Sequence, residues 1–113
     1  MTIDEAAGFL RAHDDYLIAP HDGPDADGLG AAYALAIALE LAGKRAYPLL
    51  SDEAPAKYRF IDRRGLFRNL AAGEEPPFDP SAATLVIVDT HDLGYLGQRV
   101  ERFVDETRDL LVI

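Results

Sequence analysis

The chain has 113 residues, 49% hydrophobic and 27% charged, which is the composition of one ordinary globular domain with room for a single core. Its 20 acidic residues outnumber 11 Lys and Arg residues, and the resulting net charge of -9 excludes a broad basic surface for duplex nucleic acid. No cysteine is present, so disulfides and thiolate zinc sites are excluded. The N-terminus has no secretory signal pattern and the longest apolar run is too short for a bilayer, so we expect a cytoplasmic protein without membrane contact.

The first half of the chain alternates helices and strands. A capping box that begins at Thr2 predicts a short amphipathic helix through about His13. A short apolar strand is expected over residues 16–19. Residues 30–42 are apolar except for Glu40, which predicts a helix that is buried on most sides.

The second half of the chain continues this alternation. The expected elements are strands at 45–51, 84–89 and 109–113, short helical segments at 55–64 and 66–71, a proline-rich loop at 74–80, and a helix at 97–108. Pro48 predicts an edge position or an early end for the first of these strands. The strand at 84–89 is continuously β-branched or apolar until it ends on Asp89, as burial on both faces requires, and the strand at 109–113 is expected to be buried as well. The pattern predicts an α/β domain with a parallel β-sheet and helices on both faces.

The stretch at residues 21–30 (HDGPDADGLG) carries the clearest chemical signal. It follows a strand and precedes a helix, which is where parallel α/β proteins place ligands. One His and three carboxylates lie within seven positions, together with glycines that allow close approach of the backbone. So many acidic groups would repel one another unless a divalent cation, bound by carboxylate oxygens and one imidazole, compensated their charge. The stretch therefore predicts a metal site.

A second strand also ends on an acidic residue, Asp89. Because parallel strands end at one edge of a sheet, we expect four side chains to converge there: His21, Asp25, Asp27 and Asp89. Such a set favours two cations about 3.5–4 Å apart that clamp one phosphoryl group. The alternative interpretations are a plain turn around Asp25 and Asp27 and a local cap at Asp89.

These motifs resemble those of a known family. Residues 21–30 (HxxPDxDxxG), before an alanine-rich helix, resemble the first motif of the DHH phosphoesterases, and residues 85–90 with the later Gly97 resemble the second. That family includes RecJ-like exonucleases, bacterial oligoribonucleases that also hydrolyse pAp, and DHH-type pyrophosphatases and exopolyphosphatases. The resemblance implies a Rossmann-like DHH domain.

The resemblance also implies a cofactor and roles for the four side chains. It implies a phosphoesterase with two manganese ions, or magnesium in their place, that hydrolyses short oligonucleotides or small nucleotides such as pAp by a two-metal hydroxide mechanism. His21 and Asp25 would bind one ion and Asp27 the other, while Asp89, the catalytic residue, would bridge both. The implied partner is a small nucleotide or a short single-stranded oligonucleotide.

The chain departs from the family pattern in several places. The Asp-His-His triplet and the later motifs do not occur in it, Tyr95 stands where many members carry a basic residue, and Ala31 stands where Ser is common. We therefore expect residues 1–113 to be a partial DHH domain, inactive alone and prone to self-association through uncovered apolar surface. Arg63 and Arg64 are interpreted as a solvated charged turn rather than as phosphate ligands.

Two other classes of protein stay open. A non-catalytic α/β module that binds a nucleotide or a partner would keep the fold without the chemistry. A signalling receiver domain also gathers carboxylates around a cation, but it places an adjacent acidic pair at the end of its first strand. Here Asp25 and Asp27 are separated by one residue and preceded by His21, which disfavours the receiver.

Overall fold

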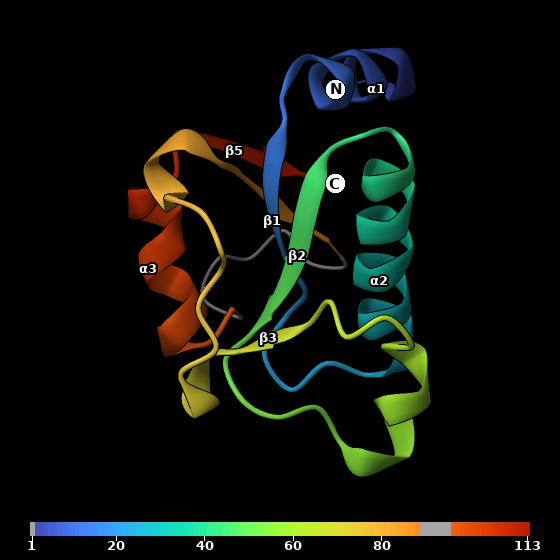
Figure 1. Ribbon diagram of the computed structural model, residues 1–113, viewed down its shortest axis with the longest axis vertical. Coiled ribbons are helices and arrows are strands. Elements are labelled where there is room, and N and C mark those ends of the chain that lie inside the picture. Colours follow the sequence, from blue (N-terminus) through green and yellow to red (C-terminus); the bar gives the residue numbers. More distant parts are fainter. Residues whose placement is uncertain (1, 89–95) are drawn as a thin grey trace.

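A five-stranded parallel sheet forms the centre of the computed structural model, which describes residues 2–88 and 96–113 (Figure 1). The strands are β1 (Asp15–Ala19), β2 (Arg45–Leu50), β3 (Arg68–Asn69), β4 (Thr84–Ile87) and β5 (Asp109–Val112). Their order across the sheet is β3-β2-β1-β4-β5, and every neighbouring pair is parallel. This is the doubly wound, Rossmann-like order, and the predicted α/β class is confirmed.

Helices cover both faces of this sheet. The α-helices are α1 (Ile3–Ala12), α2 (Ala26–Leu41) and α3 (Gln98–Glu106), and three short 3-10 helices are η1 (Ala56–Ile61), η2 (Leu70–Ala72) and η3 (Pro80–Ala82). Figure 1 shows α2 and α3 on opposite sides of the sheet. Because α2 connects β1 to β2 and α3 connects β4 to β5, the two crossovers wind in opposite directions from the centre of the sheet.

The continuous apolar sequence of β1 is explained by burial on both faces. Tyr16 and Ile18 pack with Ala32 and Ala36 of α2, whereas the alternate residues of β1 pack into a second cluster that contains Phe103 of α3. All four residues at 16–19 are fully buried. Successive side chains of a strand point to opposite faces, so a central strand between two helical layers needs apolar residues at every position.

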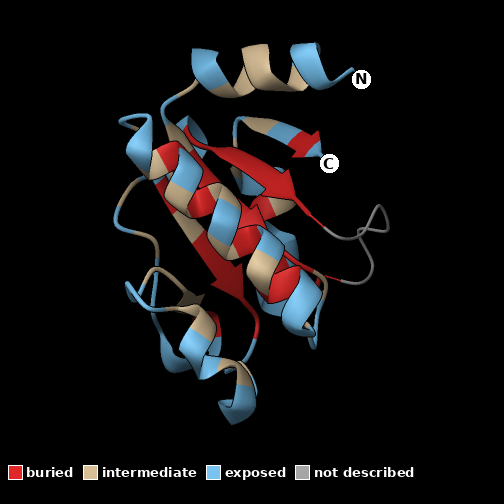
Figure 2. Ribbon diagram, turned by 90° about the vertical axis from the view of Figure 1, so that its right-hand side faces the viewer, coloured by how far each residue is buried: buried red, intermediate tan, exposed pale blue. Residues whose placement is uncertain are grey.

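Helix α2 is less buried than its composition predicts. Its buried face is formed by Gly28, Leu29, Ala32, Ala36 and Leu39, while the opposite face is exposed and Leu41 is 79% exposed (Figure 2). The expectation of burial on most sides is wrong because the helix is an outer layer and only one side meets the sheet. Its exposed residues are mostly alanines, which leave little apolar area in water. In the described part of the chain, every helix is too short or too polar to cross a bilayer.

Two expectations about the edges of the sheet are corrected. Strand β2 lies between β1 and β3, so it is not an edge strand. Pro48 is tolerated there because β3 pairs only with Leu49 and Leu50, and the hydrogen-bonded ladder between β2 and β3 therefore begins after Pro48. Strand β5 is the edge strand beside β4, and it is buried on one face only, since Leu111 is buried while Leu110 and Val112 are each 41% exposed. An edge strand without a covering layer presents alternate side chains to solvent.

The segment between β2 and β4 contains less α-helix than the sequence predicts. Within residues 55–64 only Ala56–Ile61 are helical, as the 3-10 helix η1, and residues 66–71 contain β3 and part of η2. The carboxylate of Asp62 accepts hydrogen bonds from the backbone of Leu66 and Phe67 at 2.7 and 3.1 Å. A side chain that satisfies two backbone donors in this way stabilises a turn in place of a helix.

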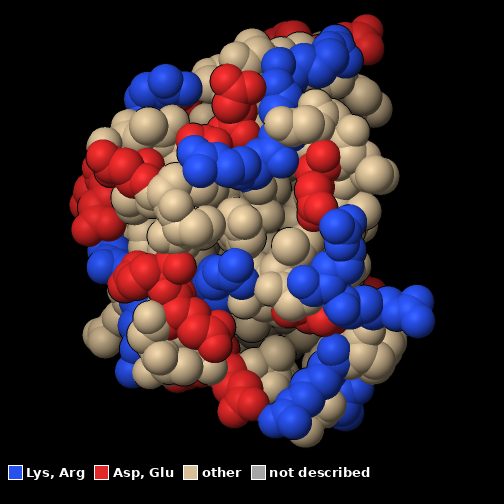
Figure 3. Space-filling model, in the orientation of Figure 1, with Lys and Arg blue, Asp and Glu red and all other residues tan. Residues whose placement is uncertain are grey.

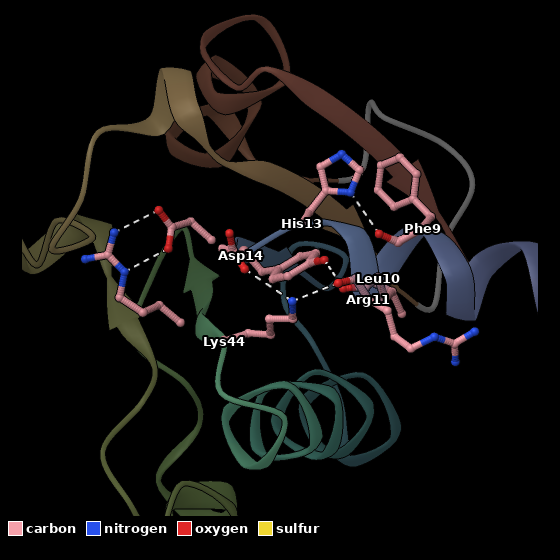
Figure 4. A network of polar contacts seen from close by, with 9 residues as sticks. Phe9, Leu10, Arg11, His13, Asp14 and Lys44 are labelled. Carbon is pink, nitrogen blue, oxygen red and sulfur yellow. Dashed lines mark hydrogen bonds and ion pairs between the residues drawn. The ribbon is translucent and has the colours of Figure 1, made fainter.

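Polar contacts attach α1 to the amino edge of the sheet (Figure 4). The Tyr16 hydroxyl donates to the carbonyl of Leu10, and burial raises the pKa of Tyr16 to about 12. The Lys44 ammonium donates to the carbonyl of Arg11 at 2.8 Å and to Asp14 at 3.2 Å. These contacts lie at the end of the strands opposite to His21, so α1 supports the fold without approaching the candidate site.

Candidate functional site

The strand order creates a topological switch point between β1 and β4. From these two neighbouring strands the chain crosses in opposite directions, to β2 and to β5. The Val88 amide donates to the carbonyl of Ala19 at 3.0 Å, so the carboxyl ends of β1 and β4 lie side by side. Ligands of doubly wound proteins bind in the crevice at such a point. Predicted site residue Asp89, next after Val88 in the sequence, lies outside the described residues.

Asp25 and Asp27 lie at the start of α2 rather than in a long loop. Helix α2 begins at Ala26, four residues earlier than expected, because the Asp25 carboxylate is its N-cap and accepts the Gly28 amide at 3.0 Å. Asp27 follows in the first helical turn, where a negative charge is stabilised by the positive end of the helix dipole. Both side chains are exposed. The structure therefore replaces the alternative of a plain turn with a capped helix start.

His21 lies two residues beyond β1 and is partly exposed. Its Nδ1 lies 2.9 Å from the carbonyl oxygen of Asp22. Because a carbonyl can only accept, the ring donates from Nδ1, and in the neutral imidazole Nε2 is then the nitrogen that would bind a cation. Backbone carbonyls commonly orient metal-binding imidazoles in this way.

A cavity of about 240 Å³ opens beside His21. Its polar lining comes from His21, Asp22, Ser51, Asp52 and Glu53, and the apolar lining includes Leu49, Leu50 and Leu96. These residues belong to the carboxyl ends of β1 and β2 and to the segment before α3. The site thus has an apolar floor and an acidic rim, which favours a cation or a cation-bound anion over a free anion.

The walls of this cavity are held together by contacts that sequence reasoning missed. Gly97, the N-cap of α3, has φ 83°, and a Cβ there would lie 2.3 Å from the Ser51 Oγ and 3.0 Å from the Asp22 Cγ. The Ser51 hydroxyl donates to the carbonyl of Leu96 at 3.3 Å. Only glycine permits this approach, so the Gly97 of the predicted second motif has a steric role here.

Arg99 fixes the same wall from the first turn of α3. Its Nη1 donates to the Ser51 carbonyl and to the Asp52 carboxylate, both at 3.2 Å. The sequence contained one signal for these residues, because Ser51 and Asp52 directly follow a predicted strand and should emerge at the same sheet edge as His21. Nothing in the sequence indicates that Arg99 reaches back to them.

The donor chemistry of the site suits manganese, but the described residues supply only part of a ligand set. The predicted ligands after β1 are one imidazole and two carboxylates, and one oxygen of Asp25 accepts the Gly28 amide in the helix cap. Within residues 2–88 and 96–113, no three His, Asp or Glu side chains are close enough to hold one ion. The predicted assignment divides His21, Asp25 and Asp27 between two ions and depends on Asp89 to complete both.

Fold and site together define a doubly wound α/β domain with a crevice at the switch point. Among solved structures, the chain is similar to an exopolyphosphatase-related protein from Bacteroides fragilis, with a TM-score of 0.79 and 16% sequence identity. The similarity covers 98% of this chain and 33% of that chain, so the present chain spans about one third of that protein's length. Comparisons with protein-family models and with curated proteins give no match. The likeness establishes the fold.

Proposed function

We propose that this chain is part of a metal-dependent phosphoesterase of the DHH type that hydrolyses short oligonucleotides or small nucleotides such as pAp. One observation carries the proposal: His21 and the acidic start of α2 lie at the carboxyl edge of β1, beside the switch point, in the order that the first DHH motif requires. Two further observations support it. The similar structure is named as exopolyphosphatase-related, and the second motif begins in β4, the strand next to β1.

In this proposal the chain's residues hold and orient two divalent cations. His21 would contribute Nε2, Asp25 the carboxylate oxygen that does not cap α2, and Asp27 a carboxylate from the first helical turn. Asp89 would bridge the two ions. The ions would neutralise the phosphoryl oxygens and activate water.

Manganese is the expected ion, because an imidazole beside carboxylates suits it better than it suits magnesium, which prefers oxygen ligands alone. Manganese should therefore perturb the His21 resonances of this chain in a metal titration. Unchanged His21 signals at millimolar metal would count against the assignment of His21.

The catalytic proposal is tested in the full-length protein by substitution of Asp89. Asp89→Ala should abolish manganese-dependent hydrolysis of pAp and of short oligoribonucleotides, and Asp89→Asn should be nearly as damaging because it removes the charge between the cations. His91→Ala, two residues away, is the matched control and should cost much less. Circular dichroism checks that the fold persists. If a folded Asp89→Ala variant kept most of its activity, the two-metal proposal would be wrong. If the wild-type protein bound nucleotide but did not hydrolyse it, a non-catalytic binding module would be favoured.

A further inference from the structure

A basic segment lies beside the candidate site of this acidic protein. Residues 57–68 contain five of the chain's 11 Lys and Arg residues and one acidic residue, Asp62, although the net charge of the chain is -9. The Asp62 carboxylate is occupied by the backbone amides of the turn. Figure 3 shows Lys and Arg gathered at the lower right of the molecule, over η1 and the connection to β3. The segment thus presents a local surplus of positive charge.

The cations of this segment differ in how strongly they are held. Arg59 pairs with Glu53 at 2.8 Å and Arg64 pairs with Glu40 at 2.6 Å. Exposed ion pairs of this kind contribute little and exchange readily with solvent. Arg63 is exposed and makes no ion pair with any residue that the structure describes. Lys57 is also exposed without an ion pair in that part of the chain, but its ammonium lies over the Tyr58 ring, so Arg63 is the exposed cation of the segment that has neither kind of contact.

An aromatic side chain stands among these cations. Phe60 lies in η1 and is 72% exposed, so its ring is offered to solvent instead of the core. Tyr58, two residues earlier, is half-buried with the Lys57 ammonium 5.1 Å from its ring centre. Exposed aromatic rings interleaved with basic residues are typical of surfaces that bind single-stranded nucleic acid, where bases stack on the rings and cations follow the phosphates.

This segment is continuous with the candidate site. A second cavity of about 230 Å³ is lined by Tyr58 and Arg59 of η1, by Asn69, and by three acidic residues, Glu53, Asp62 and Glu74. It shares Leu50 and Glu53 with the cavity beside His21. The two cavities therefore adjoin, and η1, which carries Phe60, lies next to the cavity beside His21.

We propose that residues 57–68 form a binding surface for single-stranded oligonucleotide, in which Phe60 stacks on a base and Arg63 contacts a phosphate next to the one held at the candidate site. The choice of ligand rests on the proposed function. Inorganic polyphosphate offers the same phosphates, but it has no base to stack. The position of Phe60 favours the oligonucleotide, because an exposed phenyl ring gives nothing to a chain of phosphates alone.

The test measures binding of fluorescein-labelled oligoadenylate to this chain by fluorescence anisotropy, in EDTA and at low salt. Phe60→Ala should weaken binding at least about fivefold, the lower end of the contribution of one base–aromatic stack. Its control is Ile3→Ala, which removes another exposed apolar side chain (87%) from α1 at the opposite end of the molecule and should leave binding unchanged. Arg63→Glu should weaken binding and reduce the salt dependence, whereas Arg11→Glu, with the same change in charge, should do neither.

Competition with inorganic polyphosphate separates the two ligands. Phe60→Ala should leave the competing strength of polyphosphate unchanged, while Arg63→Glu should lower it. The inference is overturned if wild-type chain does not bind oligoadenylate, if Phe60→Ala binds as tightly as Ile3→Ala, or if Phe60→Ala weakens polyphosphate equally. EDTA removes divalent cations, so this assay reports binding by residues 57–68 without any contribution from metal. Binding without manganese-dependent hydrolysis would contradict the proposed function alone. Hydrolysis by a protein whose Phe60→Ala variant binds normally would contradict this inference alone.

Discussion

Replacing Gly97 with alanine should destabilise the protein through two separable effects. At φ 83° and ψ 149° the backbone of Gly97 occupies a region that side chains rarely adopt, which costs about 1–3 kcal/mol. The new Cβ would also lie 2.3 Å from the Oγ and 2.8 Å from the Cβ of Ser51, and overpacking of this kind costs about 1–3 kcal/mol. Together these give roughly 2–6 kcal/mol, a large share of the roughly 5–15 kcal/mol typical of a domain.

Urea unfolding followed by circular dichroism measures this loss. Gly43→Ala is the matched control. Gly43 has φ 84° and open space around its position, so an alanine there should lower the free energy of unfolding through backbone strain alone. In a Ser51→Gly background, Gly97→Ala should recover the part of the loss that is due to overlap, since the two closest atoms are gone. If Gly97→Ala lowered the free energy of unfolding no more than Gly43→Ala, the close contact between α3 and the β2 loop would be refuted.

Two further changes address the start of α2 and the attachment of α1. Asp25→Ala should lower the free energy of unfolding by about 1 kcal/mol, because the Gly28 amide loses its cap. Asp25→Asn should retain most of that stability, since an amide oxygen can also cap the helix. Equal urea midpoints for Asp25→Ala and wild type would exclude the cap. Burial raises the pKa of Tyr16 to about 12 from an ordinary value of 10.0, so its contribution to stability is complete below pH 10 and declines as the pH rises toward 12. Wild type should therefore lose more stability than Tyr16→Phe across that interval, and parallel pH profiles would contradict the assignment.

Local sequence determined the elements that have strong periodicity and their order. The apolar run at 84–87, the acidic residues after β1 and the helix that contains Phe103 are each encoded within a few neighbouring positions, since period and burial on a parallel sheet are local properties. For the same reason, the position of His21 at a strand end followed directly from the sequence. The start of α2 was placed four residues late because Asp and Gly residues are typical of turns, while Asp is also a common helix cap.

The tertiary structure decided which strand ends share a wall. Ser51 and Leu96 are 45 positions apart, and their contact depends on β2 and the start of α3 meeting at one sheet edge. Strand order likewise determined that β5 is an edge with Leu110 exposed, although its sequence is as apolar as that of a central strand. Residue patterns report the environment that each segment requires, whereas the neighbours that provide it depend on how the whole chain packs.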